Sequence, residues 1–236
     1  MARRRNAVLT LIAAVVLSTA FAVAVAAAGP AEAKGVNPAH NVSISRSMSN
    51  TQWYFRHTNC QHSPGSTRCE DAIIAALNHA RKVLGQPAYR LPTHFRSWTA
   101  GHQLMTLVND DRALYHLPRV QGRTKALNAA ATVGARLNMD PLPTGHGWVS
   151  VASNWAGGMA SPLFAYYGWM YGDGLNTNGT SNNIDCSRAH PGGCWSHRDN
   201  ILRNYGRNNR LLLGIGYAHT ASGSSWTQLF QAYPRT

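Results

Sequence analysis

Apolar residues in the second quarter of the chain recur every three or four positions, a spacing that predicts two amphipathic helices. One apolar stripe follows Glu70 and Asp71, acidic residues that suit a helix N-terminus, and stops before Gly85. This stripe consists of Ile73, Ile74, Leu77 and Ala80. A second stripe starts after Thr99 and stops at Pro118, which cannot continue a helix. It consists of Leu104, Leu107, Val108, Leu114 and Leu117.

Two more helices are predicted between residues 124 and 171. Thr124 is a suitable N-cap for the first of them, and residues 140–143, with two prolines, break it. Its small-residue face, able to pack closely, consists of Leu127, Ala130, Ala131, Gly134 and Leu137. The second starts at Ser161, an N-cap followed by Pro162 in the first turn, and runs to about Tyr171.

The last part of the chain contains two predicted strands, residues 211–219 and 225–233, after a short amphipathic helix at residues 198–205. Residues 220–224 join the strands and suit a hairpin loop. The first strand is apolar or small on both faces, which is typical of a sheet covered on both sides. Because helices come early and paired strands late, the expected fold class is α+β, an α-β-α sandwich with a mainly antiparallel central sheet.

The N-terminus has the three parts of a secretory signal peptide. Residues 3–5 are arginines, residues 7–28 are almost wholly apolar, and Ala31 and Ala33 are small residues of the kind that a signal peptidase recognises. We therefore expect a signal peptide at residues 1–33. The alternative is an uncleaved membrane anchor, because the apolar run is long enough to span a bilayer.

Cleavage after Ala33 would release a basic, extracellular chain that starts at Lys34. The complete sequence has 22 basic and 9 acidic residues, a formal net charge of +13. Residues 1–33 contain three of the basic and one of the acidic residues, so the secreted chain would carry a charge of +11. This charge favours anionic envelope surfaces such as teichoic acids or acidic lipids, while a solvated surface without a partner is the alternative. The basic residues are scattered and match no nucleic-acid-binding motif, which argues against a nucleic-acid partner.

Four cysteines occur as two close pairs, Cys60 with Cys69 and Cys186 with Cys194. An even number in an exported chain is typical of disulfides, and pairing within each close pair is the simplest of the three connectivities. A four-cysteine zinc site is the alternative, but neither pair has the Cys-x2-Cys spacing of such sites. We therefore expect two local disulfides.

Six segments, in order along the chain, resemble motifs of the CAP superfamily, also called the SCP/PR-1-like family, in its bacterial branch. One is Gly193–Leu202, GCWSHRDNIL, which is similar to the family segment W-x-x-S-x-G-H-R-x-N-I-L with a shortened front part. The other five are Leu107–Arg112, Asn154–Gly158, Trp169–Met170, Leu213–Ala218 and Ser225–Phe230. Their order and approximate spacing agree with the family over about residues 97–234, and the resemblance implies an α-β-α sandwich.

The resemblance also implies one CAP-like domain at residues 60–236. Its core would be residues 97–236, and residues 60–96 would form an extra N-terminal helical element outside the usual family core. Residues 34–59, which begin with a polar sequence rich in Asn and Ser, would form a flexible leader.

Members of the family carry a cleft with two histidines and two acidic residues, sometimes with a bound divalent metal. His197 matches the histidine of the H-R-x-N-I-L motif. Ser153 stands where the family has a glutamate, and Gly172, beside Asp173, stands at the other acidic position. His146 could replace the first histidine, but it lies closer to Ser153 than the usual spacing. The resemblance therefore implies a degenerate tetrad.

The expected binding cleft contains His146, Ser153, Asn154, Asp173 and His197. General acid–base catalysis needs a histidine or carboxylate pair with separated pKa values, for which His197 and Asp173 are the candidates. A metal ion needs two or more converging ligands, for which only His146 and His197 are candidates. No cofactor is therefore expected beyond a weakly held divalent ion. Each of these residues could instead have a structural role, His197 as a hydrogen-bonded histidine and Asp173 as a turn residue.

The sequence thus predicts a secreted binding or effector module at the cell envelope, without enzymatic turnover. Its partner would be a small ligand, a lipid or a cell-wall component. A hydrolase of peptide or glycan substrates, using His197 with Asp173 or His146, is the first alternative, and Ser153 in place of glutamate argues against it. A cationic surface adhesin, whose binding weakens with salt, is the second alternative.

Overall fold

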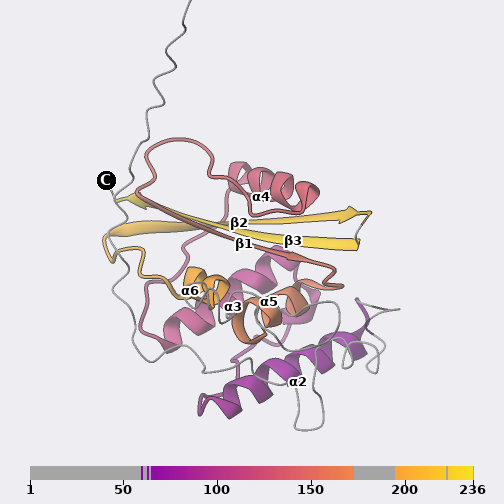
Figure 1. Ribbon diagram of the computed structural model, residues 1–236. Helices are drawn as coiled ribbons and strands as arrows, with labels where there is room; N and C mark the ends of the chain where they lie inside the picture. The colour runs from indigo at the N-terminus through magenta and orange to yellow at the C-terminus, as the bar shows by residue number, and fades with distance from the viewer. Residues whose placement is uncertain (1–59, 61–62, 64, 173–194, 222, 236) are drawn as a thin grey trace, which may run out of the picture. The chain divides into compact units, whose positions relative to one another are not determined.

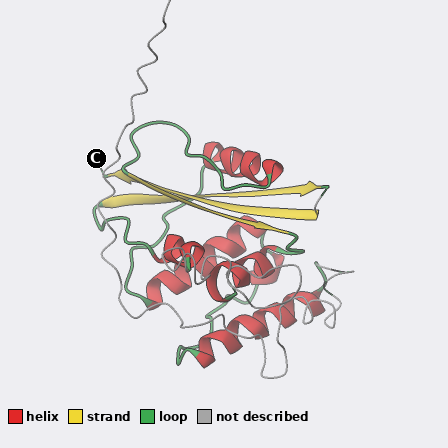
Figure 2. Ribbon diagram, viewed as in Figure 1, coloured by secondary structure: helices red, strands yellow, loops and turns green. Residues whose placement is uncertain are grey.

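The computed structural model of the 236-residue chain describes residues 60, 63, 65–172, 195–221 and 223–235 (Figure 1). Its helices are α2 (Thr67–Val83), α3 (Ala100–Leu114), α4 (Lys125–Leu137), α5 (Pro162–Tyr171) and α6 (Ser196–Leu202), with a 3-10 helix, η1, at Phe95–Ser97. Its strands are β1 (Ser150–Gly157), β2 (Asn209–Thr220) and β3 (Gly223–Pro234). These elements confirm the predicted α+β fold class (Figure 2).

The three strands form one antiparallel sheet in the order β1-β3-β2. β2 and β3 are the predicted hairpin. β1 is a strand that the sequence pattern did not predict, and it pairs with β3 so that Asn154 lies opposite Gln228. Gly122 forms an isolated parallel bridge with Leu212, so the chain near Gly122 runs along the outer edge of β2.

Helices cover both faces of the sheet and give the predicted α-β-α sandwich (Figure 1). α4 covers one face; α5 and α6 lie against the other, with α3 beside them and α2 beyond α5. α4 can approach closely because Gly214 and Gly216 face it, and a Cβ added to Gly216 would overlap the backbone of Ala131. Leu127 and Ala131 of the predicted small-residue face therefore pack directly on the strand backbone, whereas Leu137 of the same predicted face is 64% exposed.

α5 is buried along almost its whole length. Its N-cap Ser161 accepts a hydrogen bond from the Phe164 N–H at 3.2 Å, and Pro162 follows in the first turn, as predicted. Every residue from Leu163 to Tyr171 is buried. A helix that is apolar all round is typical of a protein interior, and α5 accordingly lies inside the fold.

The other predicted helices also form, with shifted boundaries: α3 ends at Leu114, whereas the predicted apolar stripe included Leu117 and stopped at Pro118. Thr124 caps α4 by accepting a hydrogen bond from the Leu127 N–H at 3.1 Å. α6 starts at Ser196 and ends at Leu202, whereas the sequence predicted residues 198–205. His197 therefore lies within the helix and not before it. No helix within the described ranges is both long and apolar enough to cross a bilayer.

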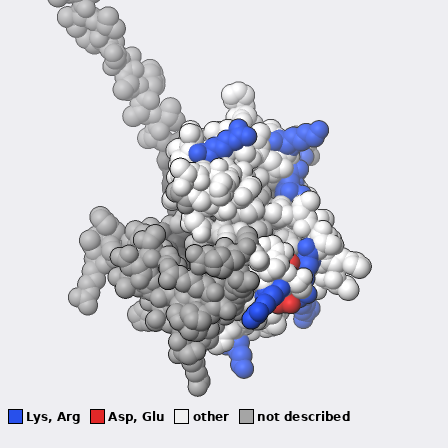
Figure 3. Space-filling view, turned by 90° about the vertical axis from the view of Figure 1, so that its right-hand side faces the viewer, with Lys and Arg blue, Asp and Glu red and all other residues white. Residues whose placement is uncertain are grey.

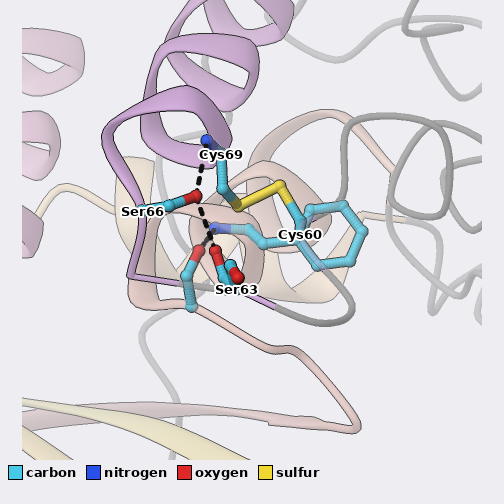
Figure 4. Close-up of a disulfide and its surroundings, with 6 residues drawn as sticks. Cys60, Ser63, Ser66 and Cys69 are labelled. Carbon is cyan, nitrogen blue, oxygen red and sulfur yellow. Dashed lines mark hydrogen bonds between the residues drawn. A yellow bond between two sulfur atoms is a disulfide. The ribbon is translucent and has the colours of Figure 1, made fainter.

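The start of α2 is held by the predicted Cys60–Cys69 disulfide, which the structure confirms with a Cα–Cα distance of 4.9 Å. Ser66 caps the helix: its hydroxyl accepts a hydrogen bond from the Cys69 N–H at 3.2 Å and donates one to the Ser63 carbonyl at 2.7 Å (Figure 4). Cap and disulfide thus converge on the same turn. The other predicted disulfide, Cys186–Cys194, and the predicted signal peptide lie outside the described residues.

Candidate functional site

Helix α6 carries His197, the candidate site residue that matches a family motif. The helix is entered through Trp195, a buried N-cap residue with a left-handed φ of 63°. A left-handed conformation costs a non-glycine residue about 1–2 kcal/mol. The cost is offset locally, because the Trp195 carbonyl accepts the Asp199 N–H at 2.7 Å and the indole is buried. The side chain of His197 is half-buried at the second position of the helix.

Three amide side chains attach α6 to the sheet. Asn154, which is fully buried, donates from Nδ2 to the His197 carbonyl at 3.1 Å and to Gln228 Oε1 at 3.3 Å. Asn200 donates from Nδ2 to the Ser153 carbonyl at 2.8 Å and to Asn154 Oδ1 at 3.0 Å. The main chain of His197 is therefore fixed against β1 and β3 by neutral hydrogen bonds, at the place where the expected cleft would be.

The side chains of Ser153 and Asn154 lie on opposite faces of the sheet, because successive side chains of a strand alternate. Asn154 faces α6. Ala152 and Ala156, two positions before and after Asn154, share its face. Ser153 shares the α4 face with Val151, which packs against the apolar cluster that contains Leu127 of α4. The structure therefore does not bring the Ser153 side chain to His197, contrary to the cleft expected from the sequence. Only the Ser153 carbonyl takes part in the α6 attachment.

His146 is exposed in the loop between α4 and β1, which is fastened to the α4 face. There the Thr144 carbonyl accepts a hydrogen bond from Gln231 Nε2 at 3.0 Å. His146 and His197 thus belong to opposite sides of the sheet and do not converge as metal ligands. Within the described ranges, no group of three or more His, Cys, Asp or Glu side chains could hold a metal ion. Asp173 lies outside the described residues.

A buried ionic cluster that the sequence did not predict lies between α2, α3 and α5. Asp111 of α3 accepts a hydrogen bond from Arg81 Nη2 at 2.6 Å, and Arg81 Nη1 reaches Asp110 at 2.7 Å. Three tyrosine hydroxyls also donate to Asp111: Tyr89 at 2.7 Å, Tyr166 at a short distance and Tyr171 at 3.4 Å. The Arg81 guanidinium lies over the Tyr89 ring, 3.3 Å from its centre. The cluster binds three helices through one carboxylate.

Burial and the Asp111 charge raise the pKa of Tyr89 and Tyr166 well above the ordinary value. Both factors disfavour a phenolate, since burial penalises any charge and Asp111 repels a negative one. Burial alone would lower the pKa of Arg81, but Tyr89 and Asp111 together raise it. The cluster is therefore an ion pair surrounded by neutral hydroxyls at physiological pH, an arrangement suited to structure and not to proton transfer.

Two further buried arginines, Arg112 and Arg198, attach α6 to the neighbouring helices. Arg112 Nη1 donates to the carbonyls of Ile201 at 2.7 Å and Arg203 at 3.0 Å, which satisfies acceptors at the C-terminal end of α6. Arg198, inside α6, donates to the Met170 carbonyl and to the Tyr115 hydroxyl, both at 2.8 Å. Burial lowers the pKa of Arg112 to about 10, which leaves it charged at neutral pH. The sequence signals were the charged triplet 110–112 within an apolar helix pattern and the presence of Arg112 and Arg198 in two of the family-like segments.

No family model, curated protein or solved structure matches the chain. The resemblance of its six segments to the CAP superfamily therefore stays a prediction from the sequence.

Proposed function

We propose that this protein is an exported, CAP-like binding module that acts at the cell envelope without enzymatic turnover. The observation that supports it is the set of amides around α6. Asn154, Asn200 and Gln228 hold the main chain of His197, and none of these side chains titrates. General acid–base catalysis requires positioned groups that take up and release protons, whereas amides can only donate and accept hydrogen bonds.

The placement of the family's tetrad positions supports the same proposal. A glutamate at position 153 would face α4, and His146 belongs to a loop on the α4 side. Neither of these two positions is therefore on the α6 side of the sheet, where His197 lies. A ligand would instead meet the half-buried side chain of His197, on a helix whose main chain is fixed by hydrogen bonds to the sheet.

The experiment compares binding and turnover for the secreted protein and two single histidine variants. His197→Ala removes the proposed contact, and His219→Ala, at an exposed position on β2, is the matched control. Binding to isolated cell-wall sacculi is measured by sedimentation, and peptide and glycan hydrolysis is measured on the same samples. We expect His197→Ala alone to weaken binding, and no sample to hydrolyse substrate. Hydrolysis by the parent that disappears in His197→Ala would establish the hydrolase instead.

A second candidate function, the cationic surface adhesin, is favoured by the distribution of surface charge. The exposed basic residues of the described part are Arg68, Lys82, Arg90, Arg96, Arg119, Arg123, Lys125, Arg136, Arg207, Arg210 and Arg235. The exposed acidic residues there are Asp71, Asp140 and Asp199. On the face shown in Figure 3, basic side chains are spread over the described surface and acidic ones are visible in one area only. Such a surface attracts anionic polymers without a defined pocket.

Salt dependence separates the two candidates. Screening shortens the reach of exposed charges from about 30 Å at 0.01 M salt to about 8 Å at 0.15 M salt. An adhesin should therefore release anionic vesicles over this range, irrespective of His197. Binding that survives 0.15 M salt and depends on His197 would exclude the adhesin.

A further inference from the structure

A pocket of about 570 Å³ lies at the end of the β2–β3 hairpin where β2 begins and β3 ends. Its lining residues are Gln121, Gly147, Arg210, Tyr233, Pro234 and Arg235. Arg210 and Tyr233 lie directly opposite each other on neighbouring strands. Tyr233 packs against the apolar cluster on the α4 side of the sheet that contains Leu212 and Leu229. The pocket thus lies on the side away from α6, at a site that no expected cleft residue occupies.

Backbone hydrogen bonds fix the walls of the pocket. The Gln121 N–H donates to the Leu211 carbonyl at 2.8 Å, which holds the strand-like segment near Gln121 against β2. The Val149 N–H donates to the Ala232 carbonyl at 2.8 Å, which holds the loop that contains Gly147. The Arg235 N–H donates to the Asn208 carbonyl at 3.2 Å. A ligand would therefore meet a fixed backbone and would have to order only side chains such as Arg210 and Arg235.

The pocket has two arginine side chains whose charges are not compensated by the described part of the protein. Arg210 and Arg235 are both exposed, and neither guanidinium forms an ion pair or a hydrogen bond with any described residue. None of the six lining residues is acidic. Arg81 and Arg112, in contrast, donate hydrogen bonds inside the fold, Arg81 to the Asp111 carboxylate and Arg112 to the Ile201 carbonyl. The two pocket arginines are thus available for an anion.

We propose that this pocket binds the phosphate ester of a sugar or polyol. Guanidinium groups match phosphate oxygens through paired N–H donors, and a phosphate has enough oxygens to accept from two arginines at once. A volume of about 570 Å³ fits a small molecule and exceeds what a bare phosphate ion fills. The half-buried ring of Tyr233 offers an apolar surface with a polar end to the carbon part of the ligand. The pocket is a different site from the one proposed on α6. It would bind an anion at one defined place, and not through charge spread over the whole surface.

The test uses the secreted protein and three arginine variants of equal charge. Arg210→Ala and Arg235→Ala remove the pocket cations, and Arg90→Ala, exposed in the segment between α2 and η1, is the control. Calorimetry with glycerol 3-phosphate, inorganic phosphate and glycerol gives the affinities, and sedimentation with phosphatidylglycerol and phosphatidylcholine vesicles tests a lipid source. Each pocket variant should weaken binding by about 10-fold or more, the loss expected for a charged hydrogen bond, and the control by less than about 2-fold.

The outcomes separate the sources and the proposals. Binding of glycerol 3-phosphate that depends on both pocket arginines supports a soluble or polymeric phosphate ester. Binding of phosphatidylglycerol vesicles alone, with the same dependence, supports a lipid headgroup. Equal losses in all three variants would overturn the pocket in favour of a diffuse cationic surface. Absence of phosphate-ester and vesicle binding by the parent would also overturn it, whereas the function proposed for α6 would still be decided by the sacculus experiment with His197→Ala.

Discussion

The two faces of the sheet are packed by different means. On the α4 face, Gly214 and Gly216 let the helix backbone approach the strands, and the hydroxyl of Thr227 donates to the Ala131 carbonyl at 2.6 Å. On the other face, the wholly buried α5 adjoins the ionic cluster around Asp111 and the buried Arg112. One face depends on the absence of side-chain volume, and the other depends on buried charged groups held by an ion pair and by hydrogen bonds.

This difference predicts different weaknesses. A close-packed interface without charges responds to a change of volume and not to pH. A buried charge is costly unless it is paired and hydrogen-bonded, so the α5 side should respond to the loss of any one partner. His197 lies on the charge-dependent side, since α6 is held by Arg112 and Arg198. A substitution that disrupts the buried charged groups should therefore also displace α6 and His197.

The largest expected effect is the loss of the carboxylate at the centre of the cluster. Asp111→Ala leaves the Arg81 guanidinium buried without one of its two counter-charges. It also removes the acceptor of the Tyr166 hydroxyl and one of the two hydrogen-bond partners of the Tyr89 hydroxyl. Breaking a buried pair in this way costs about 3–5 kcal/mol. The free energy of unfolding, measured by urea titration, should fall by this amount.

The exposed ion pair between Arg96 and Asp71 is the matched control for Asp111→Ala. Their side chains are 48% and 49% exposed, so the pair is largely solvated. Asp71→Ala should therefore lower the free energy of unfolding by only about 0–1 kcal/mol. Similar losses in the two variants would contradict the difference between buried and exposed charge on which the comparison depends.

Features with local sequence signals were predictable. The N-caps Thr124 and Ser161, the small-residue face of α4 and the β2–β3 hairpin each depend on residues a few positions apart. The Cys60–Cys69 disulfide closes a short loop and could be predicted for the same reason. These signals were sufficient for the α+β class, because helices and a paired hairpin in this order leave few ways to cover both faces of a sheet.

Features that depend on distant partners were not predictable. β1 places polar Asn154 among its buried residues, so its apolar alternation is weak, and the partner Gln228 is 74 residues away. The face on which Ser153 lies could not be predicted for the same reason: without the strand, its alternation could not be applied. The role of Asp111 could not be predicted from neighbouring residues either, since its partner Arg81 lies 30 residues earlier.

A change of volume on the α4 face should have the next largest effect. Gly216→Ala adds a Cβ that would overlap the backbone of Ala131, so α4 must shift or the strand must bend. Overpacking of this kind typically costs about 1–3 kcal/mol. Gly65→Ala is the control, because a Cβ there meets nothing within 4 Å and its φ is not left-handed. Urea titration of both should show a loss for Gly216→Ala alone; an unchanged Gly216→Ala would mean that α4 is not closely packed.

Alkaline pH should weaken the charge-dependent side of the sheet. Burial raises the pKa of Tyr89, Tyr166, Tyr171 and Tyr205, so the folded protein keeps protons that the unfolded chain releases near pH 10. Stability is therefore fully present below about pH 10 and is lost as the pH rises further, by up to about 1.4 kcal/mol per pH unit for each tyrosine. Melting temperatures between pH 8 and 11 should show the decline, with a smaller slope in Tyr166→Phe. An unchanged slope in that variant would remove Tyr166 from the group that causes it.

The smallest expected effect is the loss of the one hydroxyl that joins α4 to β3. Thr227→Val keeps the shape of the buried side chain but removes the donor to the Ala131 carbonyl. That carbonyl can still accept the ordinary helical hydrogen bond, so no acceptor is left without a partner. A typical neutral hydrogen bond contributes about 1 kcal/mol, and this is the expected loss in urea titration.

Thr132→Val is the matched control for Thr227→Val, because the Thr132 hydroxyl donates to the Asn128 carbonyl within α4 and joins no two layers. It should change the free energy of unfolding by less than about 0.5 kcal/mol, as for most substitutions away from buried networks. The loss in free energy of unfolding should therefore decrease in the order Asp111→Ala, Gly216→Ala, Thr227→Val, Thr132→Val. If Thr227→Val cost as much as Asp111→Ala, hydrogen bonding would matter equally on both faces. The α4 face could then no longer be described as held mainly by close packing.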